Sequence, residues 1–445
     1  MILSIIIAFL LSLIILTLVV SRYSWFIKHS NLYGHILLFF MGWKVLAYYL
    51  ATPILDLLDD FKYWKLYKID HFEYVFLYII ELVSTFIFII AIITILPLLK
   101  FKRVRIKENL LIMLVLLITL YSNAASILEN LTFGLIKNQL EFFKSLAQFL
   151  GQPLAIILLF HFKKMNWLLK ILIALVLFTT ILMVNTRGFI VYSILTLLSL
   201  YLFYNKWRFK RRHILYLSVI SIIFITLIGS FPQLSLDVDK SETSSRGSFS
   251  ITGYDNESKT SGRTFFEEID FRFGMMARMS SKFVHLYFND EAAGFNPILN
   301  SAVGIIPRSV WPNKPHPSTL DGNDLYSQGM YKIYSASVNK YSTNMVEFSS
   351  GGHMFWELGI IGVLFFPIVS ALFVSLIISF FKAKTNYIGL AMLISSFKPW
   401  GFMEPKIWLS DIPLQIYQIW FPLLLLYIIA RFIRIFKKTI LKILK

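Results

Sequence analysis

The chain has 445 residues, of which 57% are hydrophobic and only 15% are charged, and it contains no cysteine. Soluble domains carry roughly 45–50% apolar and about 25% charged residues, so this composition excludes an ordinary water-soluble globule. The missing cysteines exclude disulfides, thiolate metal sites and a cysteine nucleophile, while the formal net charge of +18 calls for a look at where the basic residues lie.

The first predicted elements are membrane spans, because apolar runs of about 18 or more residues are long enough to cross a bilayer as helices. About eleven such runs follow one another, with a range of about 10–13, since the run at 386–400 is short enough to re-enter rather than cross. The first run has no basic segment before it and no small-residue cleavage site, which indicates an uncleaved span. The runs lie at 2–20, 33–54, 73–98, 109–128, 146–162, 166–184, 189–205, 214–231, 354–381, 386–400 and 412–433. The expected fold class is an all-α polytopic membrane protein.

The positions of the basic residues predict how the protein is oriented in the membrane. Residues 231–353 hold 11 Lys and Arg against 13 Asp and Glu, so the positive excess lies elsewhere, in short clusters between apolar runs. Each cluster follows an odd-numbered span, so one topology places all of them in the cytoplasm, as the positive-inside rule predicts. Clusters separated by spans form no single basic face, and no nucleic-acid partner is expected. The clusters are Arg22/Lys28, residues 100–107, Lys163/Lys164, residues 206–212, Lys382/Lys384 and the C-terminal tail.

That topology divides the chain into four parts. Residues 1–231 form an N-terminal transmembrane bundle, 232–353 a large extracytoplasmic loop, 354–433 the C-terminal transmembrane helices and 434–445 a basic cytoplasmic tail. Within the loop, the apolar residues of 264–288 recur at helical spacing, which predicts amphipathic helices against the membrane surface. The three prolines of 307–315 predict a rigid extended turn.

The sequence contains no Walker A motif, no dinucleotide-binding glycine fingerprint and no HExxH. The expected cytoplasmic loops are too short for a nucleotide-sugar site, so any chemistry belongs to the outer face. Nucleotide donors are scarce there, and an enzyme would need a donor activated in advance, such as a polyprenyl-diphosphate-linked sugar.

A diphosphate needs cations, and arginine suits it because its planar fork binds phosphate oxygens in pairs. Arg187, in the short outer turn Asn185-Thr186-Arg187-Gly188, is the first candidate, although an arginine at a helix end can also simply reach toward water. The loop cations can equally form surface ion pairs with Glu267, Glu268 or Asp270. The further candidate diphosphate contacts are Arg263, Arg272, Arg278, Arg308 and Lys314.

The candidate proton acceptors lie where the chain re-enters the membrane. His353 and Glu357 are four positions apart and share one helix face, where either can accept a proton from a sugar hydroxyl, pair with the other or anchor the helix. Asp270 is a further candidate base. No cluster has metal-ligand spacing, so neither a metal nor a cofactor is predicted. Lys44, Glu81, Lys170 and Lys398 lie inside predicted spans, and their default role is structural.

Three segments together resemble a known family. Asn-Thr-Arg-Gly at 185–188, Ile-Pro-Arg-Ser-Val-Trp-Pro-Asn-Lys-Pro at 306–315 and Phe-Trp-Glu-Leu-Gly-Ile-Ile-Gly at 355–362 resemble the Wzy-type polymerases of O-antigen, enterobacterial common antigen and capsule repeat units. The resemblance covers about 185–365 by motif and the first half only by hydropathy. It places the family's essential arginines on Arg187 and, less directly, on Arg263, Arg278 and Arg308.

The resemblance implies a metal-independent GT-C-type glycosyltransferase in the bacterial cytoplasmic membrane. Such enzymes transfer a growing glycan en bloc from undecaprenyl diphosphate to a fresh lipid-linked repeat unit. The implied partners are the lipid-linked donor and acceptor, the bilayer, a chain-length regulator and a flippase. Two alternatives stay open: an O-antigen ligase, which the Trp-Pro-Asn-Lys-Pro segment disfavours, and a lipid-linked oligosaccharide flippase or other transporter, which needs no large outer loop.

Overall fold

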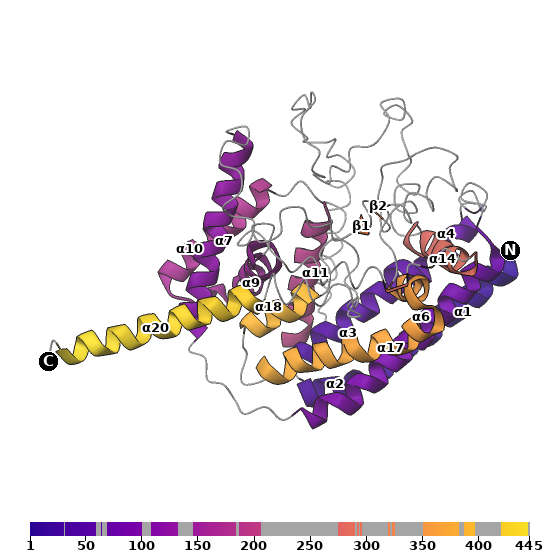
Figure 1. Ribbon diagram of the computed structural model, residues 1–445, viewed down its shortest axis with the longest axis horizontal. Helices are drawn as coiled ribbons and strands as arrows, with labels where there is room; N and C mark the ends of the chain where they lie inside the picture. Colours follow the sequence, from indigo (N-terminus) through magenta and orange to yellow (C-terminus); the bar gives the residue numbers. More distant parts are fainter. Residues whose placement is uncertain are drawn as a thin grey trace.

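The computed structural model describes the chain as almost entirely helical (Figure 1). The described residues are 1–30, 32–58, 64, 69–99, 108–131, 146–183, 187–205, 275–289, 292, 294–295, 319–320, 323–324, 350–381, 387–396 and 420–443. The strands within this part are β1 (Thr319–Leu320) and β2 (Asn323–Asp324), which pair antiparallel with Thr319 opposite Asp324.

Most of the described helices come from the first half of the chain. They are α1 (Ile2–Ser21), α2 (Tyr23–Ser30), α3 (Leu32–Lys44), the π-helical η1 (Val45–Leu50), α4 (Ala51–Leu58), α6 (His71–Leu98), α7 (Glu108–Leu131), the π-helical η2 (Ala147–Gly151), α9 (Gln152–Phe160), the short η3 (Phe162–Lys164), α10 (Trp167–Met183) and α11 (Arg187–Tyr204). The second half adds α14 (Met275–Phe288), α17 (Ser350–Phe381), α18 (Tyr387–Ser396) and α20 (Phe421–Ile443).

Four helical stretches of the described residues are long and apolar enough to cross a membrane: Ile2–Ser30, Leu32–Leu58, His71–Leu98 and Gly351–Ser379. Every other predicted span contains a shorter helix, except 214–231, which lies outside the described residues. The short run predicted at 386–400 contains a helix of only 10 residues, Tyr387–Ser396. The described part is therefore almost entirely helical, in agreement with the expected class, and the count of eleven spans stays a prediction.

The long helices turn apolar side chains outward and small polar ones inward. Leu3 is 70% and Phe365 is 51% exposed, whereas Ser12, Ser84 and Ser370 are fully buried. Lipid tolerates an apolar surface, and small residues let neighbouring helices approach closely. Ser12 donates a hydrogen bond to the carbonyl of Tyr49 (3.0 Å), which joins α1 to η1. This distribution fits helices whose solvent is a bilayer.

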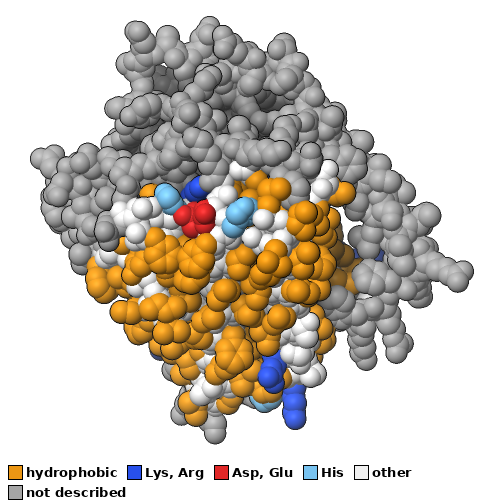
Figure 2. Space-filling model, turned by 90° about the vertical axis from the view of Figure 1, so that its right-hand side faces the viewer, with side chains coloured by type: hydrophobic (Ala, Val, Ile, Leu, Met, Phe, Trp, Pro, Cys, Tyr) orange, Lys and Arg blue, Asp and Glu red, His pale blue; other side chains and the backbone are white. Residues whose placement is uncertain are grey.

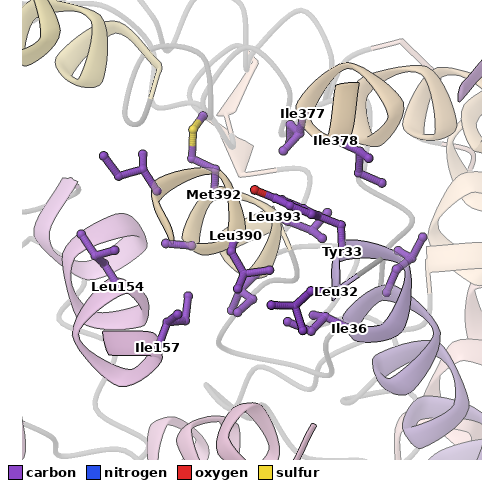
Figure 3. Close-up of a cluster of buried hydrophobic side chains, with 14 of the residues drawn as sticks. Leu32, Tyr33, Ile36, Leu154, Ile157, Ile377, Ile378, Leu390, Met392 and Leu393 are labelled. Atoms are coloured by element: carbon purple, nitrogen blue, oxygen red, sulfur yellow. The ribbon is translucent and has the colours of Figure 1, made fainter. Parts of the chain in front are cut away.

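One large apolar core joins the two halves of the chain. Figure 3 shows its centre, where α18 lies among α3, α9 and α17 and contributes Leu390, Met392 and Leu393. The first half contributes Leu32, Tyr33, Ile36, Leu154 and Ile157, and α17 contributes Ile377 and Ile378. Packing across this core places α17 in one cluster with helices that lie far earlier in the sequence, such as α3 and α9.

The α6 helix begins where its sequence supplies a cap. The Asp70 carboxylate accepts hydrogen bonds from the backbone N–H groups of Phe72 (2.8 Å) and Glu73 (3.1 Å), which satisfies two donors that a helix start leaves unpaired. Capping fixes the first turn of α6, and with it the position of Glu73.

The helix α14 lies across one end of this assembly, near the N-terminus and α4 (Figure 1). It falls within the predicted helical segment 264–288, and it packs against α4, α6 and α17. Its buried face includes Ala277, Phe283 and Val284. A helix between the predicted spans thus covers the ends of helices from both halves of the chain.

Candidate functional site

The site is built where α14 meets the ends of α4, α6 and α17. Ionisable side chains are rare within apolar helices and mark functional sites by default. Four groups of them gather here: Asp56 with Arg278, Lys44 with Glu81, His353 with Glu357, and Glu73 with His285.

The Asp56–Arg278 pair is fully buried. Nε and Nη2 of Arg278 each lie 2.7 Å from Oδ1 of Asp56, and Tyr74 donates to the other carboxylate oxygen over 2.9 Å. Neither charged side chain exposes more than 1% of its surface. Burying two charges is unfavourable unless they are paired and hydrogen-bonded, which this arrangement achieves. Arg278, predicted as a diphosphate contact, is here engaged by a carboxylate of α4.

A row of tyrosines continues from this pair into the bundle. The hydroxyls of Tyr74 and Tyr78 lie 3.2 Å apart, and Tyr78 donates to the carbonyl of Tyr49 over 3.3 Å. Tyr49 belongs to the π-helical η1, a form of helix that recurs at functional sites. The row therefore links α6 to η1 beside the buried ion pair.

Lys44 and Glu81 form the second group, and they hold the start of α17. Nζ of Lys44 lies 3.8 Å from Oε2 of Glu81, and the backbone N–H of Gly351 donates to Oε1 over 2.8 Å. A Cβ atom at Gly351 would lie 2.4 Å from that oxygen, so a larger residue there would displace the Glu81 carboxylate. A carboxylate is favourable at a helix N-terminus, where free N–H groups and the helix dipole attract negative charge. The structural role expected of Lys44 and Glu81 fits this geometry.

His353 and Glu357 face each other on α17, as their spacing predicts. Nδ1 of His353 lies 3.3 Å from Oε1 of Glu357, and neither side chain exposes more than 1% of its surface. The ring of Phe283 on α14 packs against this turn, with its centroid 5.9 Å from that of His353 and 4.9 Å from that of Trp356. This contact agrees with pairing, one of the roles left open for these two residues, and their catalytic role stays a prediction.

Glu73 and His285 form the group that reaches the surface. Nδ1 of His285 lies 2.5 Å from Oε1 of Glu73, and the side chains are 51% and 10% exposed. Asn289 places its amide nitrogen 3.0 Å from Nε2 of the same ring and donates to the His285 carbonyl over 2.9 Å. Neither Glu73 nor His285 was predicted from the sequence.

His285 lies among exposed polar side chains close to exposed aromatic ones. Figure 2 shows acidic and histidine side chains together at the upper edge of a broad hydrophobic face. Asp70, His71 and His285 are exposed at this end. Two exposed phenylalanines, Phe72 and Phe288, lie beside them with ring centroids 5.9 Å apart. Aromatic rings of this kind are typical of the boundary between a bilayer and water.

The other predicted site residues are not placed by the structure. Arg187 is the first residue of α11, and its side chain lies outside the described part. Asp270, Arg263, Arg272, Arg308 and Lys314 also lie outside the described residues. Among the residues that the structure describes, no group of three or more His, Asp or Glu has the arrangement of a metal site.

Comparisons with protein-family models, with curated proteins and with solved structures found no match for this chain. The described part of the chain is a helical protein with helices long and apolar enough to cross a membrane. Its helix α14 is joined to two of these stretches by ion pairs, Arg278 with Asp56 and His285 with Glu73.

Proposed function

We propose that this chain is a Wzy-type polymerase of polysaccharide repeat units. It transfers a glycan from polyprenyl diphosphate to the sugar of a second lipid-linked unit, at the outer face of the cytoplasmic membrane. The observation that carries the proposal is the docking of α14 onto the ends of α4, α6 and α17, which gathers ionisable groups at the edge of an apolar surface. A lipid-linked substrate presents its diphosphate and sugars at this level of a bilayer.

The third motif of the resemblance supports the proposal through its geometry. Within Phe355–Gly362, α17 is interrupted at Leu358 and Gly359, and Gly359 has a φ of +60°. A Cβ atom at Gly359 would lie 2.1 Å from the hydroxyl of Tyr287 on α14. Glycine adopts positive φ at no steric cost and leaves room for the tyrosine. The motif thus forms the junction between α14 and the span that follows the large loop.

The reaction asks for two kinds of group, a cation for the departing diphosphate and an acceptor for the proton of the attacking hydroxyl. We assign the diphosphate to Arg187, Arg263, Arg272, Arg308 and Lys314, since guanidinium groups form charge-assisted bonds with phosphate oxygens. Arg278 is engaged by Asp56, and we assign it to holding α14 in place. The bond from the anomeric carbon to the diphosphate breaks with its electrons on the leaving oxygen, while the acceptor oxygen bonds to that carbon.

Deletion of the gene, followed by electrophoresis of the cell-surface glycan, tests the proposal. We expect glycan with a single repeat unit in the deletion strain and restoration of the ladder by the intact gene. Loss of all attached repeats would instead indicate a ligase or a flippase. An unchanged ladder would overturn the assignment to polysaccharide assembly.

A further inference from the structure

The pair of His285 and Glu73 has the geometry of an oriented base. A carboxylate only accepts hydrogen bonds, so Nδ1 of His285 must carry the proton that it shares with Glu73. In the neutral ring, Nε2 is then the acceptor, which agrees with the Asn289 amide nitrogen 3.0 Å away. A carboxylate that fixes one nitrogen of an imidazole and leaves the other as a proton acceptor is the arrangement of an activating histidine.

The position of His285 gives its Nε2 atom access to a substrate. The ring is 51% exposed, whereas Glu73 behind it is 10% exposed, so the carboxylate orients the ring from the protein side. The exposed rings of Phe72 and Phe288 lie close in sequence to Glu73 and His285, with their centroids 5.9 Å apart. Figure 2 shows acidic and histidine side chains at the edge of a broad hydrophobic face. A sugar attached to a lipid diphosphate lies just beyond such an edge.

The buried ion pair of Arg278 and Asp56 helps to hold the helix that carries the His285 ring. Arg278 and His285 are seven residues apart on α14, so they lie on one face of the helix, two turns apart. Each bonds to a carboxylate near the end of a predicted span, Arg278 to Asp56 and His285 to Glu73. The buried pair fixes the helix, and the half-exposed pair is left at the surface.

The alternative base, His353, is in a different situation. It exposes 1% of its side chain, and the rings of Phe283 and Trp356 lie against it. In this arrangement of α14 on α17, the ring of His353 is closed to an acceptor sugar. At His285, by contrast, the acceptor hydroxyl takes the place of the amide of the exposed Asn289, which keeps its second bond to the His285 carbonyl.

We infer that His285, held by Glu73, takes the proton from the attacking hydroxyl of the acceptor sugar; this rests on the proposed polymerase function. The oxygen of that hydroxyl bonds to the anomeric carbon of the donor as its proton passes to Nε2 of His285. The bond from the anomeric carbon to the diphosphate breaks, and the electron pair leaves with polyprenyl diphosphate. Water then takes the proton from His285, which returns the ring to its starting state.

Purified full-length protein in lipid nanodiscs, supplied with the lipid-linked repeat unit from the deletion strain, tests the inference. Glutamine at position 285 keeps a donor for Glu73 but cannot take up a proton. We expect His285→Gln to lower kcat by about 10²–10⁴-fold, the usual contribution of a general base, with KM for the lipid-linked unit and the melting temperature close to wild type. Added imidazole should raise the rate of His285→Ala.

His71→Gln is the matched control, because His71 is an exposed histidine at the same end of α6, two positions from Glu73. It should retain the wild-type kcat. Wild-type kcat in His285→Gln, or a loss that follows the melting temperature and resists imidazole, would overturn the inference and leave polymerisation standing. If His353→Gln alone lost kcat, the base would be His353. A wild-type protein that forms no polymer in this assay would overturn the proposed function itself, and the inference with it.

Discussion

At the scale of single residues, two of the ion pairs in the described helices join positions that are far apart in the sequence. Arg278 bonds to Asp56, 222 positions away, and His285 bonds to Glu73, 212 positions away. His353 and Glu357 are only four positions apart, and their spacing alone was enough to predict that they share a helix face. Hydropathy gives no signal for the long-range pairs, because it does not say which helix ends meet.

The buried Asp56–Arg278 pair yields a stability prediction. Asp56→Ala removes the carboxylate that pairs with the buried Arg278 guanidinium, and breaking such a buried pair costs about 3–5 kcal/mol of unfolding free energy. Thermal unfolding in detergent should therefore show a much lower melting temperature for this variant.

The matched comparison is the double variant Asp56→Leu/Arg278→Met, which removes both charges at similar volume. It should regain most of the lost stability, because an apolar pair needs no compensation. If the melting temperature of Asp56→Ala equals that of the wild type, the pair does not hold α14 in place.

At the scale of elements, the hydropathy of the chain located helices well and their interruptions poorly. The run 73–98 corresponds to α6 at His71–Leu98, and 354–381 to α17 at Ser350–Phe381. The break at Leu358–Gly359 was not predicted, because a glycine inside an apolar run has no unique meaning until its neighbour is known. That neighbour is Tyr287, from a helix more than 60 residues earlier.

The break in α17 gives a second prediction. Gly359→Ala places a side chain at a φ of +60° and ψ of −142°, and also against the Tyr287 hydroxyl. Backbone strain at such an angle costs on the order of 1–3 kcal/mol, so we expect a lower melting temperature and weaker docking of α14.

Limited proteolysis measures the docking, because cleavage within 275–288 reports the release of α14. The double variant Gly359→Ala/Tyr287→Ala removes the clash and should recover part of the protection, but not the part due to φ. Gly42→Ala is the control, because a Cβ atom there meets nothing within 4 Å. Equal protection in Gly359→Ala and Gly42→Ala would contradict this role of the glycine.

At the scale of the whole molecule, the arrangement of the helices agrees with the basic-cluster topology in one respect. The predicted topology puts the N-terminus, the connection after α4 and the large loop on one side. In Figure 1, the N-terminus, α4 and α14 lie at the same end. The charge clusters predict one side of a membrane for segments that the structure places at one end, since the bilayer constrains helix length and loop charge strongly, and the topology itself stays a prediction.

Reporter fusions test whether the large loop lies outside the cytoplasm. A reporter that is active only outside the cytoplasm should be on when fused after Ser248 and off when fused after Arg211, because the positive-inside rule retains the basic cluster at 206–212 in the cytoplasm. The opposite pattern would reverse the topology and remove the argument for a lipid-linked donor.

The central claim is that this chain joins lipid-linked repeat units to one another. The most direct measurement supplies purified protein in nanodiscs with polyprenyl-diphosphate-linked repeat unit as the sole substrate, and follows glycan length and free polyprenyl diphosphate. The account predicts a ladder of lengthening lipid-linked glycan, with one polyprenyl diphosphate released for each unit joined. Release without lengthening, or transfer only after a different acceptor is added, would contradict it.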